Sequence, residues 1–432
     1  MEFVWKRETE RVCFPPLRGS RSVDVLIIGG GIAGLLCALK LKDEGADCIV
    51  LEADRILCGV TSNTTAKVTF SHGLIYDKLF EQLGERKARL YFEAQRSAMD
   101  DFEELCKNID CCYEKRDAFV YTLVDRERID REVVALRRLG ADACFDEAME
   151  LPFAVKGALR VKGQAQLHPL KLLYSIAGEL DIYENTKVTE LLPQKAVTQY
   201  GDVSFGKVIV ATHFPIFNKH GAYFLKMYQH RSYVLALAGA DIPSGMYVDE
   251  CDKGLSFRPY GDLLLLGGGG HRTGKSGGGW RELEDFTKKH YGGARIVGRW
   301  ATQDCMTLDS VPYVGRYSPK AENMFVATGF NKWGMTNSMA AASLLCDLVR
   351  GRGNRYAEIF SPSRSMLHKQ LFVNALEAFG GLLRPTVPRC PHLGCALIYN
   401  EAEHSWDCPC HGSRFTETGE LLDNPATDGK RM

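Results

Sequence analysis

The sequence predicts a mixed α/β (α+β) fold followed by a small C-terminal unit that is rich in loops. Residues 23–52 read as a buried strand, a glycine-rich turn, a helix and a second strand. Further strand patterns alternate with helix patterns up to residue 350, which is typical of α/β domains. Four of the fifteen cysteines then lie between residues 390 and 410, which indicates a separate site in a separate unit.

Length and charge limit the classes of function. The chain has 432 residues, 45% of them hydrophobic, which fits about two to four domains. Lys plus Arg and Asp plus Glu both number 54, and this balance argues against a nucleic-acid binder and against a polybasic membrane binder. The longest apolar run, 26–39, is too short to span a bilayer, and the first ten residues lack the apolar segment of a signal peptide. We expect a cytoplasmic protein without a nucleic-acid partner or a membrane span.

The first element predicts a Rossmann-like dinucleotide site. The pattern Gly29-x-Gly31-x-x-Gly34 follows a strand, opens a helix and has Glu52 at the end of the next strand. Gly29 makes the tight turn, Gly31 lets the backbone approach a pyrophosphate, and Gly34 lets helix and strand pack closely. The helix N-terminus attracts the phosphates, and Glu52 accepts hydrogen bonds from ribose hydroxyls. This motif alone leaves both FAD and NAD open.

The later elements follow from hydrophobic periodicity. Residues 84–109 predict an amphipathic helix, because their apolar residues share one stripe. Short apolar runs predict strands at 207–212, 233–238, 262–266 and 323–328, and an alanine-rich helix at 336–350. Residues 351–365, rich in Gly, Arg, Ser and Pro, predict a linker, and a short helix follows at about 366–380.

Residues 269–276 match the phosphate-loop pattern G-x4-G-K-S. A phosphate loop continues into a helix, whereas three further glycines follow here, and glycine is a poor residue with which to begin a helix. We therefore expect a flexible loop after a strand rather than nucleotide hydrolysis. His271 and Arg272 in this loop would face substrate or solvent.

The cysteine cluster predicts a metal centre. Cys390-Pro-His392 gives C-x-H, and Cys408-Pro-Cys-His411 gives C-x-x-H. Two thiolates and two imidazoles can also hold zinc, but zinc fingers place both cysteines first. One Cys and one His in each half suit a [2Fe–2S] cluster with Cys on one iron and His on the other.

The runs C-P-H-L-G-C at 390–395 and C-P-C-H-G-S at 408–413 closely resemble the Rieske proteins. The resemblance implies a disulfide between Cys395 and Cys410 that ties the two cluster loops together. It also implies that Ser413 donates a hydrogen bond to a bridging sulfide. Phe415 stands where high-potential members often have Tyr, so one hydrogen bond that raises the potential is missing.

Two further features complete this resemblance. Asn424-Pro425-Ala426 matches the proline loop that shields the cluster. Only about 25 residues separate the linker from Cys390, fewer than the several strands of a full Rieske domain need. We expect a reduced, that is shortened, Rieske unit whose cluster is shielded from solvent partly by the rest of the protein.

The remainder, about 23–350, resembles the D-amino-acid-oxidase (DAO) family of flavoenzymes, which includes glycine oxidase and sarcosine oxidase. Beside the glycine fingerprint, the resemblance is carried by G-V-T-S-N-T-T-A-K at 59–67, Val188, V-A-T at 210–212, S-V-P-Y-V-G at 310–315 and A-T-G-F at 327–330. It implies FAD, with 59–67 beside the isoalloxazine and 328–336 near its pyrimidine end. The FAD-binding residues implied are Gly29, Gly31, Ile32, Ala33, Gly34, Glu52, Thr61, Thr64, Thr65, Lys67, Val188, Ala211, Thr212, Thr328, Gly329, Gly334, Met335 and Thr336.

This resemblance also implies a domain plan. A Rossmann-like FAD-binding domain (1–75, 151–215 and 301–350) carries an inserted mixed-sheet substrate domain (76–150 and 216–300) of the glycine-oxidase type. A linker with a short helix (351–389) leads to the reduced Rieske unit (390–432), mostly β and loops.

Together these cofactors predict an FAD-dependent oxidoreductase. A flavin accepts a hydride and a Rieske cluster carries one electron, so we expect oxidation of a C–N bond of an amine or amino acid, with electrons passing through the cluster to an unknown one-electron acceptor. Candidate positioning groups are Arg258, as a carboxylate anchor, and His271, Arg272, Lys67 and Lys332. Lys332 would place positive charge near the reduced flavin.

Two alternatives stay open at this point. The protein could be a non-catalytic electron carrier or redox sensor with a vestigial substrate pocket. A Rieske oxygenase would need a mononuclear iron held by two His and a carboxylate. His213 and His220 are the only close histidine pair in the large domain, and no carboxylate partner stands out.

Overall fold

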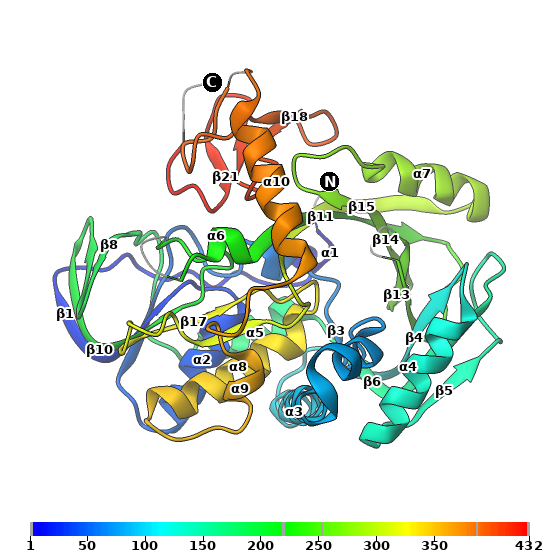
Figure 1. Ribbon diagram of the computed structural model, residues 1–432, viewed down its shortest axis with the longest axis horizontal. Coiled ribbons are helices and arrows are strands. Elements are labelled where there is room, and N and C mark those ends of the chain that lie inside the picture. The colour runs from blue at the N-terminus through cyan, green and yellow to red at the C-terminus, as the bar shows by residue number, and fades with distance from the viewer. Residues whose placement is uncertain (1–2, 218–220, 252–253, 386–387, 430–432) are drawn as a thin grey trace.

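The computed structural model describes residues 3–217, 221–251, 254–385 and 388–429. Three sheets organise the described chain (Figure 1). The C-terminal unit, residues 390–429, lies over one end of the second sheet, beside β11 and β15. The candidate site forms where these parts meet.

Eight strands form the first sheet among the described residues. They run in the order β16-β17-β10-β1-β2-β7, with β9 and β8 attached to β10. Their bounds are β1 (Arg21–Ile28), β2 (Cys48–Leu51), β7 (Ile182–Tyr183), β8 (Val188–Leu192), β9 (Lys195–Thr198), β10 (Gly201–Val210), β16 (Tyr313–Arg316) and β17 (Met324–Thr328).

Parallel pairing brings the chemistry-bearing turns to one edge of this sheet. Ile28 of β1 pairs with Val210 of β10 and with Leu51 of β2, and Val210 also pairs with Val326 of β17. The residues that follow these strands therefore emerge together at the carboxyl edge, where ligands bind in open α/β sheets.

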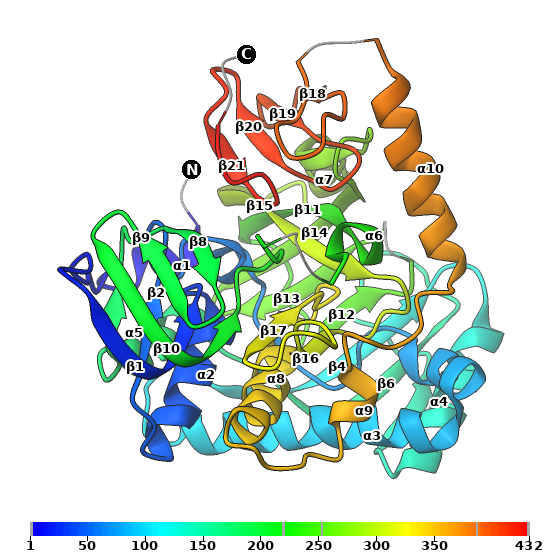
Figure 2. The same ribbon diagram turned by 60° about the vertical axis from the view of Figure 1, so that its left-hand side comes forward.

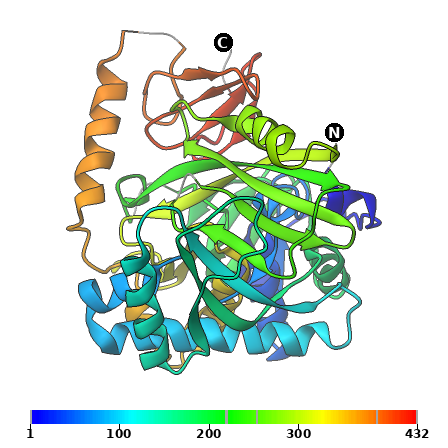
Figure 3. The same cartoon turned by 90° about the vertical axis from the view of Figure 1, so that its right-hand side faces the viewer.

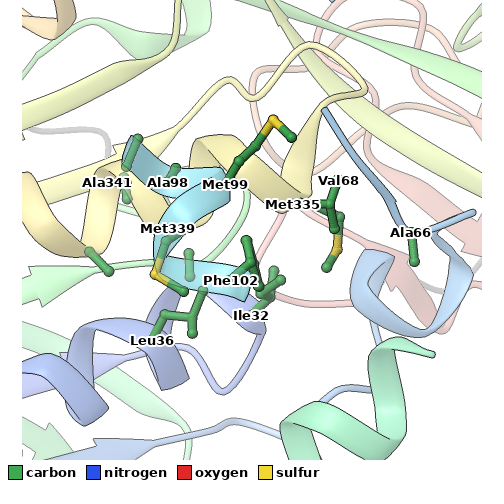
Figure 4. Packing of buried hydrophobic residues seen from close by; sticks show 14 of the residues in the cluster. Ile32, Leu36, Ala66, Val68, Ala98, Met99, Phe102, Met335, Met339 and Ala341 are labelled. Atoms are coloured by element: carbon green, nitrogen blue, oxygen red, sulfur yellow. The ribbon is translucent and has the colours of Figure 1, made fainter. Parts of the chain in front are cut away.

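Helices α2 (Ile32–Asp43), α3 (Ile75–Cys106) and α8 (Gly334–Val349) build the core beneath that edge. Figure 4 shows how Leu36, Phe102 and Met339 from these three helices pack together. All three side chains are buried. The prediction of a helix at 336–350 is confirmed by α8. The helix expected at 84–109 begins earlier, at Ile75, because α3 continues through a kink at Gly84 (φ 78°).

The second sheet has nine described strands, in the order β15-β11-β14-β13-β12-β4-β6-β3, with β5 on β6. Their bounds are β3 (Lys67–Val68), β4 (Glu114–Thr122), β5 (Ala143–Asp146), β6 (Gly157–Gln166), β11 (Met227–Ala238), β12 (Met246–Asp249), β13 (Ser256–Tyr260), β14 (Leu263–Arg272) and β15 (Arg295–Thr307). Strand β6 belongs to the segment 151–215, which we expected within the FAD-binding domain, but it pairs with β4 in this second sheet.

Two expectations about residues 269–279 are wrong. Strand β14 continues to Arg272, so the first glycines of the phosphate-loop pattern lie in a strand rather than a flexible loop. Helix α7 (Gly279–His290) begins at the third of the three following glycines. Gly279 has φ 57°. Strand β14 lies so close to it that a Cβ on Gly269 would be 2.3 Å from the Gly279 carbonyl oxygen. Tertiary packing therefore overrides the low helix propensity of glycine here.

The C-terminal unit is a four-stranded antiparallel sheet of β18 (Ile398–Asn400), β19 (Ser405–Asp407), β20 (Arg414–Thr416) and β21 (Leu421–Asp423). Helix α10 (Lys369–Leu383) leads to it and confirms the short helix predicted at 366–380. Figures 2 and 3 show α10 at the margin of the molecule beside this sheet. None of the helices within the described ranges is long and apolar enough to cross a membrane.

The remaining helices connect these parts. They are α1 (Val4–Arg7), η1 (Val60–Asn63), α4 (Arg126–Leu139), α5 (Pro169–Ala177), α6 (Tyr223–Lys226) and α9 (Ala357–Phe360).

Candidate functional site

A cavity of about 1140 Å³ opens at the carboxyl edge of the first sheet. Gly29, Glu52, Ala211 and Thr328, each at or just after the end of a strand, line its first wall. The second sheet forms the opposite wall, and residues 421–424, 426 and 427 of the C-terminal unit close one end. All three parts of the protein therefore meet at one cavity.

The glycine turn has the shape that a dinucleotide requires. Gly29 has φ 113°, and a Cβ there would lie 2.5 Å from the Ala211 carbonyl oxygen. A Cβ on Gly34 would lie 1.9 Å from the Gly29 carbonyl oxygen, so only glycine allows this approach of helix to strand. Helix α2 begins at Ile32, in the cavity wall, where Ile32 N donates to Thr61 Oγ1 (3.1 Å), and the positive end of the helix dipole makes this position suitable for phosphates.

Two backbone hydrogen bonds hold the Glu52 carboxylate beside this turn. Its Oε2 accepts a hydrogen bond from Gly30 N (2.7 Å) and its Oε1 accepts one from Asp54 N (3.0 Å). Burial raises the pKa of Glu52, and the backbone donors act in the opposite direction. A carboxylate fixed in this way suits the ribose hydroxyls of the predicted cofactor.

Most of the residues predicted to bind FAD line the cavity. These are Gly29, Gly31, Ile32, Ala33, Glu52, Thr61, Thr64, Thr65, Lys67, Val188, Ala211, Thr212, Thr328, Gly329, Gly334 and Met335. Gly34 and Thr336 instead lie behind the lining. Thr336 Oγ1 donates to the Thr69 carbonyl oxygen (3.0 Å) and is buried. The residues present fit a dinucleotide of the size of FAD.

His72 and Trp333 belong to the site although neither was among the individual residues predicted to bind FAD. Both line the cavity, and their rings stack with centroids 5.0 Å apart. His72 bonds Tyr91 Oη (2.7 Å) through Nδ1 and Thr336 Oγ1 (2.9 Å) through Nε2. Burial lowers the pKa of His72 to about 3, so this imidazole stays neutral and acts as a fixed wall.

Two lysines give the cavity its electrostatic character. Lys67 lies in the wall, and burial together with the charge of Arg258 lowers its pKa to about 7. Lys332 also lines the cavity, in a left-handed conformation with φ 70°. Burial raises the pKa of nearby Asp304 to about 6, and the charge of Lys332 counteracts this rise.

Arg258 and His271 do not line the cavity. Arg258 is buried in β13, donates to the Leu167 carbonyl oxygen (2.8 Å) and lies over the ring of Trp5 (5.0 Å). The expectation that Arg258 anchors a substrate carboxylate in the cavity is therefore wrong, because Trp5 of the N-terminal segment covers its guanidinium group. His271 is buried as well, and its Nε2 bonds Tyr233 Oη (3.0 Å), which does face the cavity. The structure therefore brings only Lys332 of the three predicted catalytic residues to the cavity.

The four predicted cluster ligands lie in the C-terminal unit as two close pairs, one of cysteines and one of histidines. Cys390 and Cys408 are buried together in its core, and the rings of His392 and His411 lie with centroids 5.0 Å apart. His411 Nδ1 is buried without a hydrogen-bond partner among the described residues. A buried ring nitrogen beside two thiols fits a metal ligand, so these residues suit the predicted cluster.

Matching turns present the two loops. Gly394 N donates to the Cys390 carbonyl oxygen (2.9 Å), and Gly412 N donates to the Cys408 carbonyl oxygen (2.9 Å). Ser413 Oγ accepts a hydrogen bond from Ala426 N (2.9 Å), so the proline loop is fixed to the second turn.

Cys395 and Cys410 lie close together as free thiols. Sulfur atoms of Cys395, Cys408 and Cys410 are all within 4.8 Å of one another. The predicted disulfide is not formed in this structure, and the pairing stays a prediction.

Two glutamine amides join the cluster loops to the second sheet. Gln229 Nε2 donates to the carbonyl oxygens of His411 (3.1 Å) and Asn424 (2.8 Å). Gln303 Nε2 donates to Gln229 Oε1 (2.6 Å) and to the Gly412 carbonyl oxygen (2.9 Å). On the other side, Asn424 Nδ2 donates to the carbonyl oxygen of Thr212, in the cavity wall (2.8 Å). The loop that carries His411 is thus tied to the cavity through hydrogen bonds.

A buried ion-pair network holds the same junction. Arg231 of β11 pairs with Glu403, and Arg414 pairs with Glu403 (2.9 Å), Asp407 (2.9 Å) and Asp423 (3.0 Å). Burial opposes the charge of Glu403, but Arg231 and Arg414 outweigh it and hold the pKa of this carboxyl below its usual range. Since neither arginine is more than 6% exposed at its side chain, the pairs are shielded from water.

The phosphate-loop pattern is part of this junction too. A Cβ on Gly274 would lie 2.5 Å from Pro409 Cα, so the turn after β14 packs directly on the second cluster loop. This contact gives residues 269–276 a structural role that fits the rejection of nucleotide hydrolysis. The histidine pair of the oxygenase alternative cannot be compared, since His220 lies outside the described residues.

Comparison with known families agrees with this geometry. Residues 24–348 match the family of FAD dependent oxidoreductases (DAO), and residues 361–431 match the Rieske [2Fe-2S] domain. A Rieske 2Fe-2S iron-sulfur protein of Bacillus subtilis (strain 168), YhfW, is 34% identical in a match that covers 98% of this chain and 96% of that protein. Gamma-glutamylputrescine oxidoreductase of Escherichia coli (strain K12) is 27% identical over 79% of this chain and 87% of its own length.

The fold has close structural neighbours as well. Glycine oxidase from Geobacillus kaustophilus superposes with a TM-score of 0.67 at 20% identity, covering 80% of this chain and 99% of that one. The chain therefore belongs to the DAO family of FAD-dependent oxidoreductases and carries a C-terminal Rieske [2Fe-2S] domain.

Proposed function

We propose that the protein oxidises a carbon–nitrogen bond of an amine or amino acid and passes the electrons singly, through the Rieske cluster, to a one-electron acceptor. The observation that carries this proposal is the shared cavity, whose walls include the dinucleotide turn and residues 421–427 of the Rieske domain. A cluster whose own domain lines the flavin cavity is suited to serve as the exit for electrons.

The residue assignments are part of the proposal. FAD is held by the cavity-lining residues named above, with Glu52 at the ribose and the α2 N-terminus at the pyrophosphate. The cluster is held by Cys390, His392, Cys408 and His411. Cys395 and Cys410 are placed to form the disulfide under oxidising conditions, because their thiols are already adjacent.

Bound FAD supplies the hydride acceptor for a carbon attached to nitrogen, and the product is an imine that water hydrolyses. An amine must lose its ammonium proton before it can give up this hydride. Lys67 is suited to accept that proton, because it lines the cavity and its lowered pKa of about 7 leaves a substantial fraction of it neutral near neutral pH. His72 and Trp333, whose rings stack, form part of the wall of the same cavity.

The substrate class rests on relatives. Proteins similar to this one are named for glycine and for gamma-glutamylputrescine, both of which carry oxidisable C–N bonds. An arginine anchor for a substrate carboxylate is not part of the proposal, because Arg258 is buried away from the cavity.

Anaerobic mixing of the holoprotein with a panel of amines tests this function. The panel includes glycine, L-proline, sarcosine and gamma-glutamylputrescine. We expect at least one compound to bleach the flavin absorption band, followed by the electron paramagnetic resonance (EPR) signal of a reduced Rieske cluster. If dithionite bleaches the flavin but no C–N compound does, the substrate assignment is wrong.

A further inference from the structure

Helix α10 turns its apolar side to solvent. Phe372, Leu376, Phe379 and Leu383 are 65%, 72%, 63% and 68% exposed. Their spacing of four, three and four residues places them on one stripe of the helix. Leu367, Val373 and Leu382 extend the exposed apolar surface. An apolar stripe of this length on the surface of a protein marks an interaction site.

The opposite side of α10 is polar and faces the protein. Asn374 is buried, and its Oδ1 accepts a hydrogen bond from Arg272 Nη1 (3.0 Å). Glu377 pairs with Lys275 (2.6 Å). An ordinary surface helix has the reverse arrangement, with its apolar stripe inward. These anchors on the opposite side of the helix therefore hold the apolar side outward.

The charges around the stripe are of one sign. Residues 361–393 contain four Lys or Arg and a single acidic residue, Glu377, in a chain whose overall charge is zero. One of the four, Arg364, is paired with Asp309 (2.6 Å) and does not add to the charge around the stripe. That acidic residue is turned inward and neutralised by Lys275. Lys369 and Arg384, at the two ends of the helix, are exposed. An apolar stripe with a cationic rim is complementary to a surface that is apolar within and anionic at its edge.

We propose that α10 docks the protein on an anionic lipid surface, with the helix in the plane of the headgroups. Fifteen residues are too few to cross a bilayer, which leaves the in-plane orientation. A second copy of the chain is a poorer occupant, because its stripe carries the same positive rim and the two would repel. The net charge of the whole chain, which argued against membrane binding, is zero because it averages this local positive charge with the rest of the protein.

The same helix touches the cluster loops. Ala396 N donates to the Gly381 carbonyl oxygen (3.0 Å), and a Cβ on Gly381 would lie 2.5 Å from Cys410 Sγ. A membrane on the outer side of α10 is thus separated from the cluster loops by one helix, about 10 Å across. Docking places the Rieske domain, rather than the FAD site, next to the lipid.

Sedimentation of the holoprotein with lipid vesicles tests the proposal. The vesicles are equimolar phosphatidylcholine and phosphatidylglycerol, or phosphatidylcholine alone. We expect binding to the mixed vesicles that weakens in high salt. Leu376→Glu with Phe379→Glu should lower the partition coefficient by about 100-fold or more, since two large apolar side chains no longer insert. Val124→Glu with Val134→Glu, at exposed apolar positions elsewhere, is the matched control and should bind as the native protein does.

A second variant separates charge from apolar contact. Lys369→Gln with Arg384→Gln should weaken binding to mixed vesicles by about 10-fold and leave the core untouched. Each variant must keep the flavin absorption and the Rieske EPR signal. Failure of the native protein to bind mixed vesicles overturns the proposal, as does equal binding to neutral vesicles. A dimer in sedimentation velocity that Leu376→Glu with Phe379→Glu dissociates would also overturn it, in favour of an interface between copies.

Discussion

Gln229 Nε2 lies 3.1 Å from the carbonyl oxygen of His411, so a strand of the second sheet holds the loop that carries a predicted iron ligand. The same amide reaches Asn424 in the proline loop. Gln229 is buried, and both of its acceptors belong to the Rieske domain. This side chain therefore fixes the position of the cluster relative to the flavin cavity.

Replacing Gln229 with Leu should slow electron transfer to the cluster and leave flavin reduction unchanged. Each buried carbonyl that loses its donor costs ~1–3 kcal/mol, which loosens the docked loop. Stopped-flow absorption at a flavin wavelength and at a cluster wavelength separates the two steps. Gln199→Leu, at an exposed position, serves as the control. If Gln229→Leu reduces its cluster as fast as the native protein does, Gln229 does not have this role.

Glu403→Gln should destabilise the Rieske domain at neutral pH. Leaving Arg231 and Arg414 without their shared carboxylate costs about 3–5 kcal/mol for a buried pair. The folded-state pKa of Glu403 lies below the unfolded value of about 4.3, so its stabilisation is complete above that value and is lost as the pH falls through the folded pKa. The difference between native and variant should shrink below about pH 4. Denaturant titration followed by the visible circular dichroism of the cluster measures it, with Glu401→Gln as the exposed control.

Gly34→Ala should remove FAD while the cluster remains. The added methyl carbon would lie 1.9 Å from a backbone oxygen, and the turn must shift to make room. The ratio of flavin absorbance to protein reports cofactor occupancy, and the Rieske EPR signal reports the cluster. Gly353→Ala meets no atom within 4 Å and should retain flavin. Full occupancy in Gly34→Ala would contradict the assignment of this turn.

The rate of flavin reduction should rise with pH through about 7. Lys67 is protonated below this value and cannot take a proton from the substrate, whereas above it the neutral amine can. Lys67→Met should abolish that rise, and Lys156→Met, at an exposed position, should keep it. The measurement is the pH profile of single-turnover flavin bleaching. An unchanged profile in Lys67→Met would assign the proton transfer to another group.

The predictable parts of this protein are those in which local sequence dictates backbone shape. Gly34 is required by its contact with Gly29 within one strand–turn–helix unit, and Gly29 by its own φ of 113°, so the local pattern alone predicted the site. The predicted ligands Cys390, His392, Cys408 and His411 lie in two short loops, and the spacing within each loop was enough to predict a metal centre there.

Contacts between distant segments could not be predicted in this way. Arg258 has the chemistry of a carboxylate anchor, but Trp5, far away in the sequence, covers it. Gln229 and Gln303 are polar residues inside strands, without any motif, and gain their role from the docked Rieske domain. The glycines at 269–279 predicted a flexible loop, whereas Gly269 packs against Gly279, and Gly274 packs against Pro409.

Rapid-freeze EPR after anaerobic mixing with a reducing amine tests the central claim, that FAD and the Rieske cluster exchange electrons within one chain. The account predicts that the reduced-cluster signal follows flavin bleaching at a rate independent of protein concentration. A flavin that stays reduced beside an oxidised cluster, or a rate that scales with protein concentration, would contradict it.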